Sequence, residues 1–187
     1  MLVGLVLAAG AGTRFGGPKG LARDAGGAPW TVIAVDVLRR AGCDRVVVAV
    51  GACADEVAAL VPPVAEVVVV ADWADGMAAS LRAGLSAALA PGGAEAVVIV
   101  PVDTPELPAS AVRRVVSALG DGVAGGLAQA VYGGRPGHPV VIGAEHVDAV
   151  IATITGDRGA RGYLRRHGVV EVECSDLWSG DDHDQRA

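Results

Sequence analysis

A glycine-rich segment with two cationic side chains follows the first apolar run of the sequence. It reads AAGAGTRFGGPK over residues 8–19 and carries Arg14 and Lys19. Glycines in such a loop let backbone N–H groups approach phosphate oxygens closely, while the cations neutralise the phosphate charge. The dinucleotide-binding fingerprint fails because Gly16 comes one residue too late, and Pro18 interrupts the Walker pattern before its lysine. The segment therefore predicts a phosphate-binding loop of another type, with an ordinary glycine-rich connection as the alternative.

The identity of residue 19 favours the phosphate loop over that alternative. Lys19 is the only lysine among the 15 basic residues of the chain. A lysine ammonium is a compact point charge on a thin stem, whereas an arginine presents a planar fork. A lone lysine in this loop therefore indicates a site that needs the compact charge.

A carboxylate stands at the end of another apolar run. In VVIVPVDTPEL, Asp103 directly follows a predicted buried strand. Ligands of open parallel sheets bind beyond the carboxyl ends of the strands, and carboxylates are preferred ligands of hard cations such as Mg²⁺. The alternative is that Asp103 or Thr104 caps the next helix, although Pro105 and Pro108 indicate an irregular start there. On position alone, metal binding and capping both stay open.

Three further polar features are candidates. His138 stands between a glycine and a proline at the start of a predicted strand, where it could contact a second substrate or bond only to the backbone. Asp157 and Arg158 could cap and charge a helix start, or contact an anionic ligand. The acidic end of the chain, about residues 175–187, is expected to be a solvated tail without fixed structure.

Apolar runs of strand length alternate with longer segments of helical periodicity. This alternation predicts a parallel sheet covered by helices on both faces, and the continuous valine-rich runs predict strands that are buried on both faces. The predicted strands begin at Leu2, Arg45, Glu66, Ala96 and Pro139. The predicted helices span residues 30–41, 54–60, 76–90 and 109–119. After about Gly120 a glycine-rich stretch follows that could hold a strand pair and a loop.

The composition narrows the class of protein. A length of 187 residues, 52% of them hydrophobic and 19% charged, predicts a single domain over residues 1–187 and excludes disordered and fibrous classes. The formal net charge of −6 argues against broad attraction to nucleic acid or anionic membranes. No apolar stretch approaches the roughly 18–20 residues of a membrane span. Three cysteines without metal-ligand spacing, and a first apolar run with no basic residue before it, predict a reduced, cytoplasmic protein.

Five motifs in the same order, covering about residues 2–173, resemble the MobA-like nucleotidyltransferase family. They are LAAGAGTRFGGPK, ADWADGMAASLRAGL, VPVDTPEL, YGGRPGHPVVI and GDRGARGYL. The resemblance implies a three-layer α/β sandwich with a mainly parallel, Rossmann-like sheet. It also implies a Mg²⁺-dependent transferase that moves a nucleoside monophosphate from a triphosphate onto a small phosphate-bearing acceptor and releases pyrophosphate.

The resemblance assigns roles to particular residues. It implies that Lys19, Arg14 and Asp103 are catalytic, and that Asp103 binds the Mg²⁺. A second acidic motif of related transferases is matched only in part by DHDQ from Asp182, so a metal-binding role there competes with the solvated tail. The implied nucleotide-binding residues are Leu7, Ala8, Ala9, Gly10, Gly12, Lys19, Gly76 and Ser80. The implied acceptor-binding residues are Tyr132, Gly137, His138 and Asp157.

The choice of substrates also comes from the resemblance. An alanine at the position of Ala9 is similar to the cytidylyltransferase branch, which implies CTP as donor and molybdopterin as acceptor, with the product open to transfer to a molybdoenzyme or its chaperone. A transferase that activates sugar or alcohol phosphates is the first alternative. The second is a degenerate nucleotide-binding module without catalysis, against which the presence of Lys19 and Asp103 counts.

Overall fold

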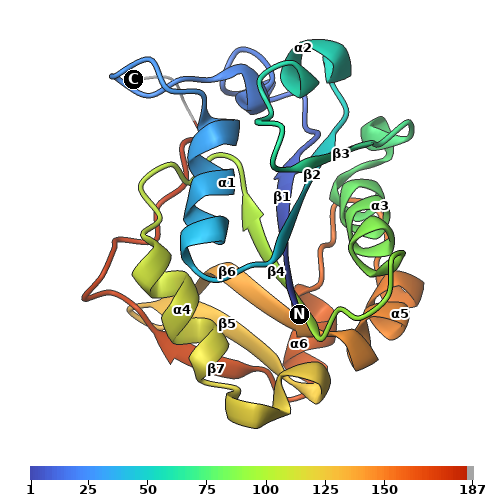
Figure 1. Cartoon of the computed structure of the whole chain (residues 1–187), viewed down its shortest axis with the longest axis vertical. Helices are drawn as coiled ribbons and strands as arrows, with labels where there is room; N and C mark the ends of the chain where they lie inside the picture. The colour runs from blue at the N-terminus through green and yellow to red at the C-terminus, as the bar shows by residue number, and fades with distance from the viewer. Residues whose placement is uncertain (185–187) are drawn as a thin grey trace.

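A seven-stranded β-sheet forms the middle layer of the structure (Figure 1). The computed structural model describes residues 1–184, and the strands in that range lie in the order β3-β2-β1-β4-β6-β5-β7. Every strand runs in the same direction except β6, which is antiparallel to β4 and β5. The strands are β1 (Leu2–Ala8), β2 (Arg45–Val50), β3 (Glu66–Val69), β4 (Ala96–Pro101), β5 (Leu127–Tyr132), β6 (Arg135–Gly143) and β7 (Val170–Glu173). The mainly parallel α/β fold predicted from the sequence is confirmed.

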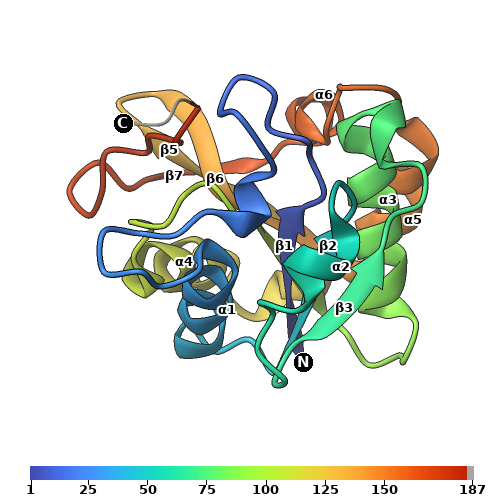
Figure 2. The same cartoon turned by 90° about the horizontal axis from the view of Figure 1, so that it is seen from above.

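Helices cover both faces of the sheet (Figure 2). Leu38 of α1 and Val112 of α4 belong to the apolar core on one face, and Leu85 of α3 and Val147 of α5 belong to the core on the other. The α-helices are α1 (Trp30–Arg40), α2 (Ala54–Ala58), α3 (Met77–Leu89), α4 (Ala109–Ser117), α5 (Ala144–Thr153) and α6 (Arg161–Arg166). Short 3₁₀ helices are η1 (Lys19–Leu21), η2 (Trp73–Asp75) and η3 (Gly120–Gly125). Within the described range, none of the helices has the length and apolar character needed to cross a membrane.

β3 differs from its expected burial. Its valine-rich run predicts a strand covered on both faces, yet Val67 is 40% exposed and Val69 is 61% exposed. β3 lies at the edge of the sheet and pairs only with β2. The run predicted the strand correctly and its burial wrongly, because β propensity does not report a strand's place in the sheet.

β6 runs opposite to the direction expected of the apolar run at Pro139. A two-residue turn joins it to β5, with Gly133 at a φ of 59° and Gly134 at a φ of 76°. Two successive residues with positive φ form the tight hairpin turn that suits the twist of paired strands, and a turn this short forces its strands to be antiparallel. The glycine-rich stretch therefore forms the strand pair that the sequence allowed.

The strand order brings two loops together at one end of the sheet. β1 lies between β2 and β4, and the N–H of Val102 donates to the carbonyl of Leu7 at 3.0 Å, so β1 and β4 end side by side. The loop after β1, residues 9–18 and called the β1 loop below, therefore lies beside Asp103. Parallel packing of β1 and β4 is what joins two motifs that are far apart in the sequence.

The end of the chain returns to this loop pair. Residues 174–184, called the C-terminal segment below, begin with a backbone hydrogen bond from Cys174 to β5 and reach the carbonyl of Asp103, which accepts the N–H of His183 at 3.0 Å. The expected lack of fixed structure is wrong for this segment, although Asp181 and Asp182 are exposed to solvent as expected. Residues 185–187 lie outside the described residues. An acidic composition predicts solubility but does not report contacts with distant parts of the chain.

Candidate active site

The β1 loop is a tight turn around one carbonyl. The carbonyl of Gly12 accepts hydrogen bonds from the N–H groups of Phe15, Gly16 and Gly17 at 2.9, 2.9 and 3.1 Å. Gly12 has a φ of 58°, and a Cβ at this position would collide with the carbonyl of Gly17, so only glycine fits. Phe15 is buried and anchors the turn. The loop therefore delivers Lys19 to one fixed place at the start of η1.

Lys19 and two carboxylates form an ion-paired cluster beyond the ends of β1 and β4. Nζ of Lys19 lies 2.6 Å from Oδ2 of Asp103 and 2.9 Å from Oδ1 of Asp184. The side chains of Lys19 and Asp103 are each 15% exposed. Arg14 approaches Asp184 at 3.5 Å, but its side chain is 81% exposed. Of the three residues expected to be catalytic, two bond to each other and Arg14 lies at the rim.

The charges of this cluster stabilise one another. Burial lowers the pKa of Lys19, but hydrogen bonds and charge attraction from Asp103 and Asp184 outweigh it and raise that pKa above its ordinary value. The hydrogen bond from Lys19, with its positive charge, holds the pKa of Asp184 below its ordinary range. Lys19 is therefore an ammonium and Asp184 a carboxylate at neutral pH.

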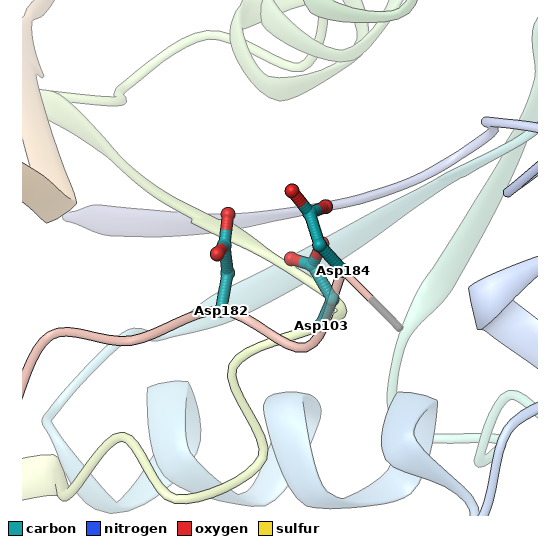
Figure 3. Close-up of side chains that lie close together, drawn as sticks. All are labelled: Asp103, Asp182 and Asp184. Carbon is teal, nitrogen blue, oxygen red and sulfur yellow. The ribbon is translucent and has the colours of Figure 1, made fainter. Parts of the chain in front are cut away.

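Three carboxylates converge at this place, as Figure 3 shows. Asp103, Asp182 and Asp184 each offer one oxygen, and these oxygens lie within 4.8 Å of one another. Oδ1 of Asp103 is buried and has no hydrogen-bond partner among the described residues, so it is free to bind a ligand. An anionic set made only of oxygens suits a hard divalent cation such as Mg²⁺ or Mn²⁺. The residues therefore fit the cation that the family resemblance implies at Asp103.

Helix capping, the alternative role for this region, does not occur. α4 begins at Ala109 after Pro108, without a side-chain cap. Thr104 instead donates its hydroxyl to the carbonyl of Pro101 at 3.0 Å. Asp103 precedes the irregular stretch that Pro105 and Pro108 create, and its carboxylate points into the ion-paired cluster with Lys19.

Contacts of the His183 side chain help to hold the C-terminal segment at the site. The ring of His183 packs against that of Trp30 with centroids 5.3 Å apart, and its Nε2 lies 2.9 Å from a carboxylate oxygen of Glu106. These contacts place the two flanking carboxylates, Asp182 and Asp184, next to Asp103. The Asp-x-Asp spacing was the only sequence signal for this arrangement.

A cavity of about 410 Å³ opens beside the carboxylates. Leu7, Gly137, His138 and Asp182 are among its lining residues. Burial lowers the pKa of His138, although nearby carboxylates oppose the shift, so its imidazole is neutral at neutral pH. Tyr132 does not line the cavity: it is 3% exposed, and its hydroxyl donates to the carbonyl of His138 at 2.7 Å. Tyr132, expected to contact the acceptor, therefore holds the backbone of the cavity wall and does not itself line the cavity.

The expected nucleotide-binding residues at the end of β1 differ in exposure. Ala8 and Ala9 are buried, and the carbonyl of Ala9 accepts the N–H of Ala52 at 2.9 Å. Gly10 is exposed at the start of the β1 loop. Gly10 is therefore open to solvent, while Leu7 of the same stretch lines the cavity.

Gly76 and Asp157 were expected in different subsites, but they lie against each other and do not line the cavity. Gly76 has a φ of 105°, and a Cβ there would lie 2.6 Å from Oδ1 of Asp157. Ser80 is buried on α3. Asp157 does not cap α6, which begins at Arg161 without a side-chain cap. The structure therefore groups Gly76 with Asp157, and neither of them lines the cavity that His138 lines.

Four residues of the cavity wall had no signal in the sequence. Arg135 and Asp181 lie 3.9 Å apart as an ion pair, and Gln129 donates to the carbonyl of Gly137 at 3.1 Å. Trp178 lines the same cavity from the C-terminal segment. These residues come from β5, β6 and the end of the chain, and only the fold brings them together.

Comparison with known proteins agrees with this geometry. The profile of the MobA-like NTP transferase domain matches residues 4–172. The chain belongs to the MobA-like NTP transferase family. As a MobA-like NTP transferase it is a nucleotidyltransferase, which confirms the class of enzyme predicted from the five motifs.

Relatives and solved structures extend the comparison. The chain is 35% identical to the molybdenum cofactor guanylyltransferase of Burkholderia ambifaria, over 94% of this chain and 87% of that protein. It is 36% identical to the nicotine blue oxidoreductase of Paenarthrobacter nicotinovorans, over 98% of this chain and 92% of that protein. Rv0371c of Mycobacterium tuberculosis H37Rv superimposes with a TM-score of 0.81 at 30% identity, covering 98% of this chain and 92% of Rv0371c. A manganese complex of Rv0371c gives a TM-score of 0.72 at 28% identity, covering 92% and 88%.

Proposed function

We propose that this nucleotidyltransferase moves a nucleoside monophosphate from a triphosphate onto a small phosphate-bearing acceptor at the carboxylate cluster of Asp103. One observation carries the proposal: the ammonium of Lys19 is fixed beside the β1 loop by Asp103, whose second oxygen is buried and free. A cation, an anionic metal site and a glycine-rich turn at one place are the parts that phosphoryl transfer needs.

Each side chain has a role that follows from its place. Asp103, with Asp182 and Asp184, would hold a divalent cation that neutralises charge on the triphosphate and the leaving pyrophosphate. Lys19 would bind phosphate oxygens as a compact cation beside the carboxylates that would hold the metal ion. Arg14 is exposed at the rim and can turn onto the triphosphate. No general base is required, because the nucleophile is an acceptor phosphate that is already ionised.

We further propose CTP as the donor and molybdopterin as the acceptor. The argument for CTP is Ala9, because the guanylyltransferase branch has glycine at this position. The relatives named molybdenum cofactor guanylyltransferase support the acceptor and make GTP the competing donor. The cavity of about 410 Å³ falls within the size range of small-molecule sites and combines apolar walls with Arg135. Transfer of the product to a molybdoenzyme or its chaperone stays a prediction.

Nucleotide binding gives the first test. Thermal unfolding is followed with CTP, GTP, ATP and UTP, with and without Mg²⁺. A ligand at about 100 times its dissociation constant adds about 2.7 kcal/mol, which raises Tm by several degrees. We expect the largest Mg²⁺-dependent shift with CTP. A larger shift with GTP would overturn the choice of base, and no shift with any nucleotide would overturn the proposed nucleotide site.

A matched pair of variants tests the metal site. Asp103→Asn is expected to abolish the Mg²⁺-dependent part of the nucleotide shift and pyrophosphate release with molybdopterin. Asp36→Asn removes the same charge from an exposed position on α1, where it pairs with Arg40, and should leave both unchanged. Normal pyrophosphate release by Asp103→Asn would refute the assignment of this site.

A second candidate function rests on the relative from Paenarthrobacter. Because the chain is 36% identical to a protein named nicotine blue oxidoreductase, an oxidoreductase reaction is the competing activity. The test is bleaching of nicotine blue in the presence of a reduced nicotinamide dinucleotide, without any nucleoside triphosphate. Dye reduction that survives Asp103→Asn, together with no nucleotide shift, would favour the oxidoreductase.

A further inference from the structure

A second hollow, of about 520 Å³, lies apart from the carboxylate cluster at the end of α5 and along α6. Its lining comes from one continuous stretch of chain, residues 153–166. Four of the lining residues are arginines, namely Arg158, Arg161, Arg165 and Arg166. A single carboxylate, that of Asp157, lines the same hollow, so its walls carry a net positive charge in a chain of net charge −6.

These four guanidinium groups differ from the other arginines of the described residues. Nine arginines elsewhere in that range each form at least one side-chain hydrogen bond or ion pair: Arg14, Arg23, Arg39, Arg40, Arg45, Arg82, Arg113, Arg114 and Arg135. The guanidinium groups of the hollow form none with any described residue, Asp157 included. Among the arginines of residues 1–184, those without a protein partner are therefore the ones that share a concave surface.

Unpaired arginines around a hollow favour an anionic ligand. Each guanidinium is always charged and offers donors in a planar fork that matches the oxygens of phosphate-like groups. Mutual repulsion of four like charges is relieved when an oxyanion binds among them, and exposure lets that anion reach them from solvent. Nothing in the packing of α6 requires these charges, because its buried residues are Tyr163 and Leu164.

The hollow is joined to the cavity beside Asp103. Gly159 and Arg161 line both, so the two share one wall. We propose that the arginine hollow binds an oxyanion group, phosphate or a similar tetrahedral oxyanion, at a site separate from the triphosphate. That oxyanion is either the phosphate of the acceptor, held here before it reaches the triphosphate, or a free anion. Only the first of these two sources rests on the proposed function.

Titration of the intact protein with inorganic phosphate, followed by calorimetry, tests the site. Arg165→Gln/Arg166→Gln is the test variant, because neither residue lines the cavity beside Asp103. Arg39→Gln/Arg40→Gln is the matched control, since it removes two adjacent arginines from the last turn of α1. We expect phosphate binding to weaken at least tenfold in the test variant, as loss of about 1.4 kcal/mol implies, and to stay unchanged in the control. Equal affinities in all three proteins, or equal losses in both variants, would overturn the proposal.

Two further measurements identify the source of the anion. If it belongs to the acceptor, the test variant raises the KM for molybdopterin at least tenfold while the KM for the nucleotide stays constant, and molybdopterin displaces the bound phosphate. If it is a free anion, phosphate and molybdopterin bind together and the KM for molybdopterin does not change. Failure of nucleotidyl transfer itself would leave the phosphate titration intact, so the two proposals fail separately.

Discussion

The two halves of the sheet build the site in different ways. In the parallel half, β3-β2-β1-β4, Asp103 and the β1 loop that leads to Lys19 follow strands that end side by side. In the other half, β6-β5-β7, the cavity wall comes from a hairpin, a helix start and the C-terminal segment. A parallel sheet gathers its functional groups at one end by topology alone, whereas the mixed half depends on individual long-range contacts. We therefore expect substitutions in the parallel half to affect chemistry with little loss of stability, and substitutions in the mixed half to affect stability and acceptor binding together.

The largest effect is expected for Lys19→Met. Loss of one preorganised cation from a phosphoryl-transfer site lowers the rate by about 10² to 10³-fold. Binding of Mn²⁺ without nucleotide should instead tighten, by about tenfold, because the ammonium no longer competes for Asp103 and Asp184. Steady-state kinetics and an electron paramagnetic resonance titration measure the two effects. Unchanged or weaker Mn²⁺ binding would contradict the idea that the Lys19 ammonium competes with the metal ion for these carboxylates. Arg14→Met, which removes the exposed cation at the rim of the site, is the control.

Gly180→Ala probes the mixed half. Gly180 has a φ of 81°, and a Cβ there would collide with the ring of Tyr132. We expect a loss of about 2–4 kcal/mol in the free energy of unfolding, from backbone strain and overpacking together. Gly134→Ala is the control, because Gly134 has a φ of 76° with open space around it, and it should cost only about 1 kcal/mol. Urea denaturation measures both, and equal losses would show that the Tyr132 contact is unimportant.

Asp184→Asn tests the ion pair that links the C-terminal segment to Lys19 in the parallel half of the sheet. Asp184 is on the C-terminal segment but bonds to Lys19 of the parallel half at 2.9 Å. Because its side chain is 48% exposed, we expect a loss of about tenfold in transfer rate and in Mn²⁺ affinity, smaller than for the buried pair. Asp176→Asn changes the same charge on the same segment, in a pair with Arg114 outside the site. Equal kinetic losses in the two variants would indicate displacement of the segment rather than loss of a ligand.

The smallest effect is a pH dependence at the end of β7. The pKa of Glu173 is lowered from about 4.5 to about 2 by hydrogen bonds from the side-chain hydroxyl and backbone N–H of Ser175 and from the backbone N–H groups of Gly133 and Gly134. A carboxylate with a depressed pKa stabilises the fold above pH 4.5, and that stabilisation disappears as the pH falls toward 2. The difference in Tm between the wild type and Glu173→Gln should therefore be present at pH 6 and shrink below pH 4. A difference that is independent of pH would contradict this account.

Several features of the site were predictable because they depend on local sequence. The β1 loop needs Gly12 for its positive φ and Lys19 for its charge, and both lie in one short stretch. Asp103 was found because buried parallel strands are recognisable as valine-rich runs and their carboxyl ends bind ligands. The capping alternative for Asp103 could be removed only when α4 was found to start at Ala109.

The sequence by itself determined the α/β class and the family, and it predicted the residues of the parallel half of the candidate site. The tertiary structure alone decided that β6 runs antiparallel, that Tyr132 faces the core, and that Asp184 reaches Lys19 across 165 positions of the chain. It also decided which of the arginines in the described part of the chain form no side-chain pair. The physical reason is range: glycine turns and apolar periodicity act between near neighbours, whereas ion pairs and cavity walls depend on where the folded chain brings distant residues together.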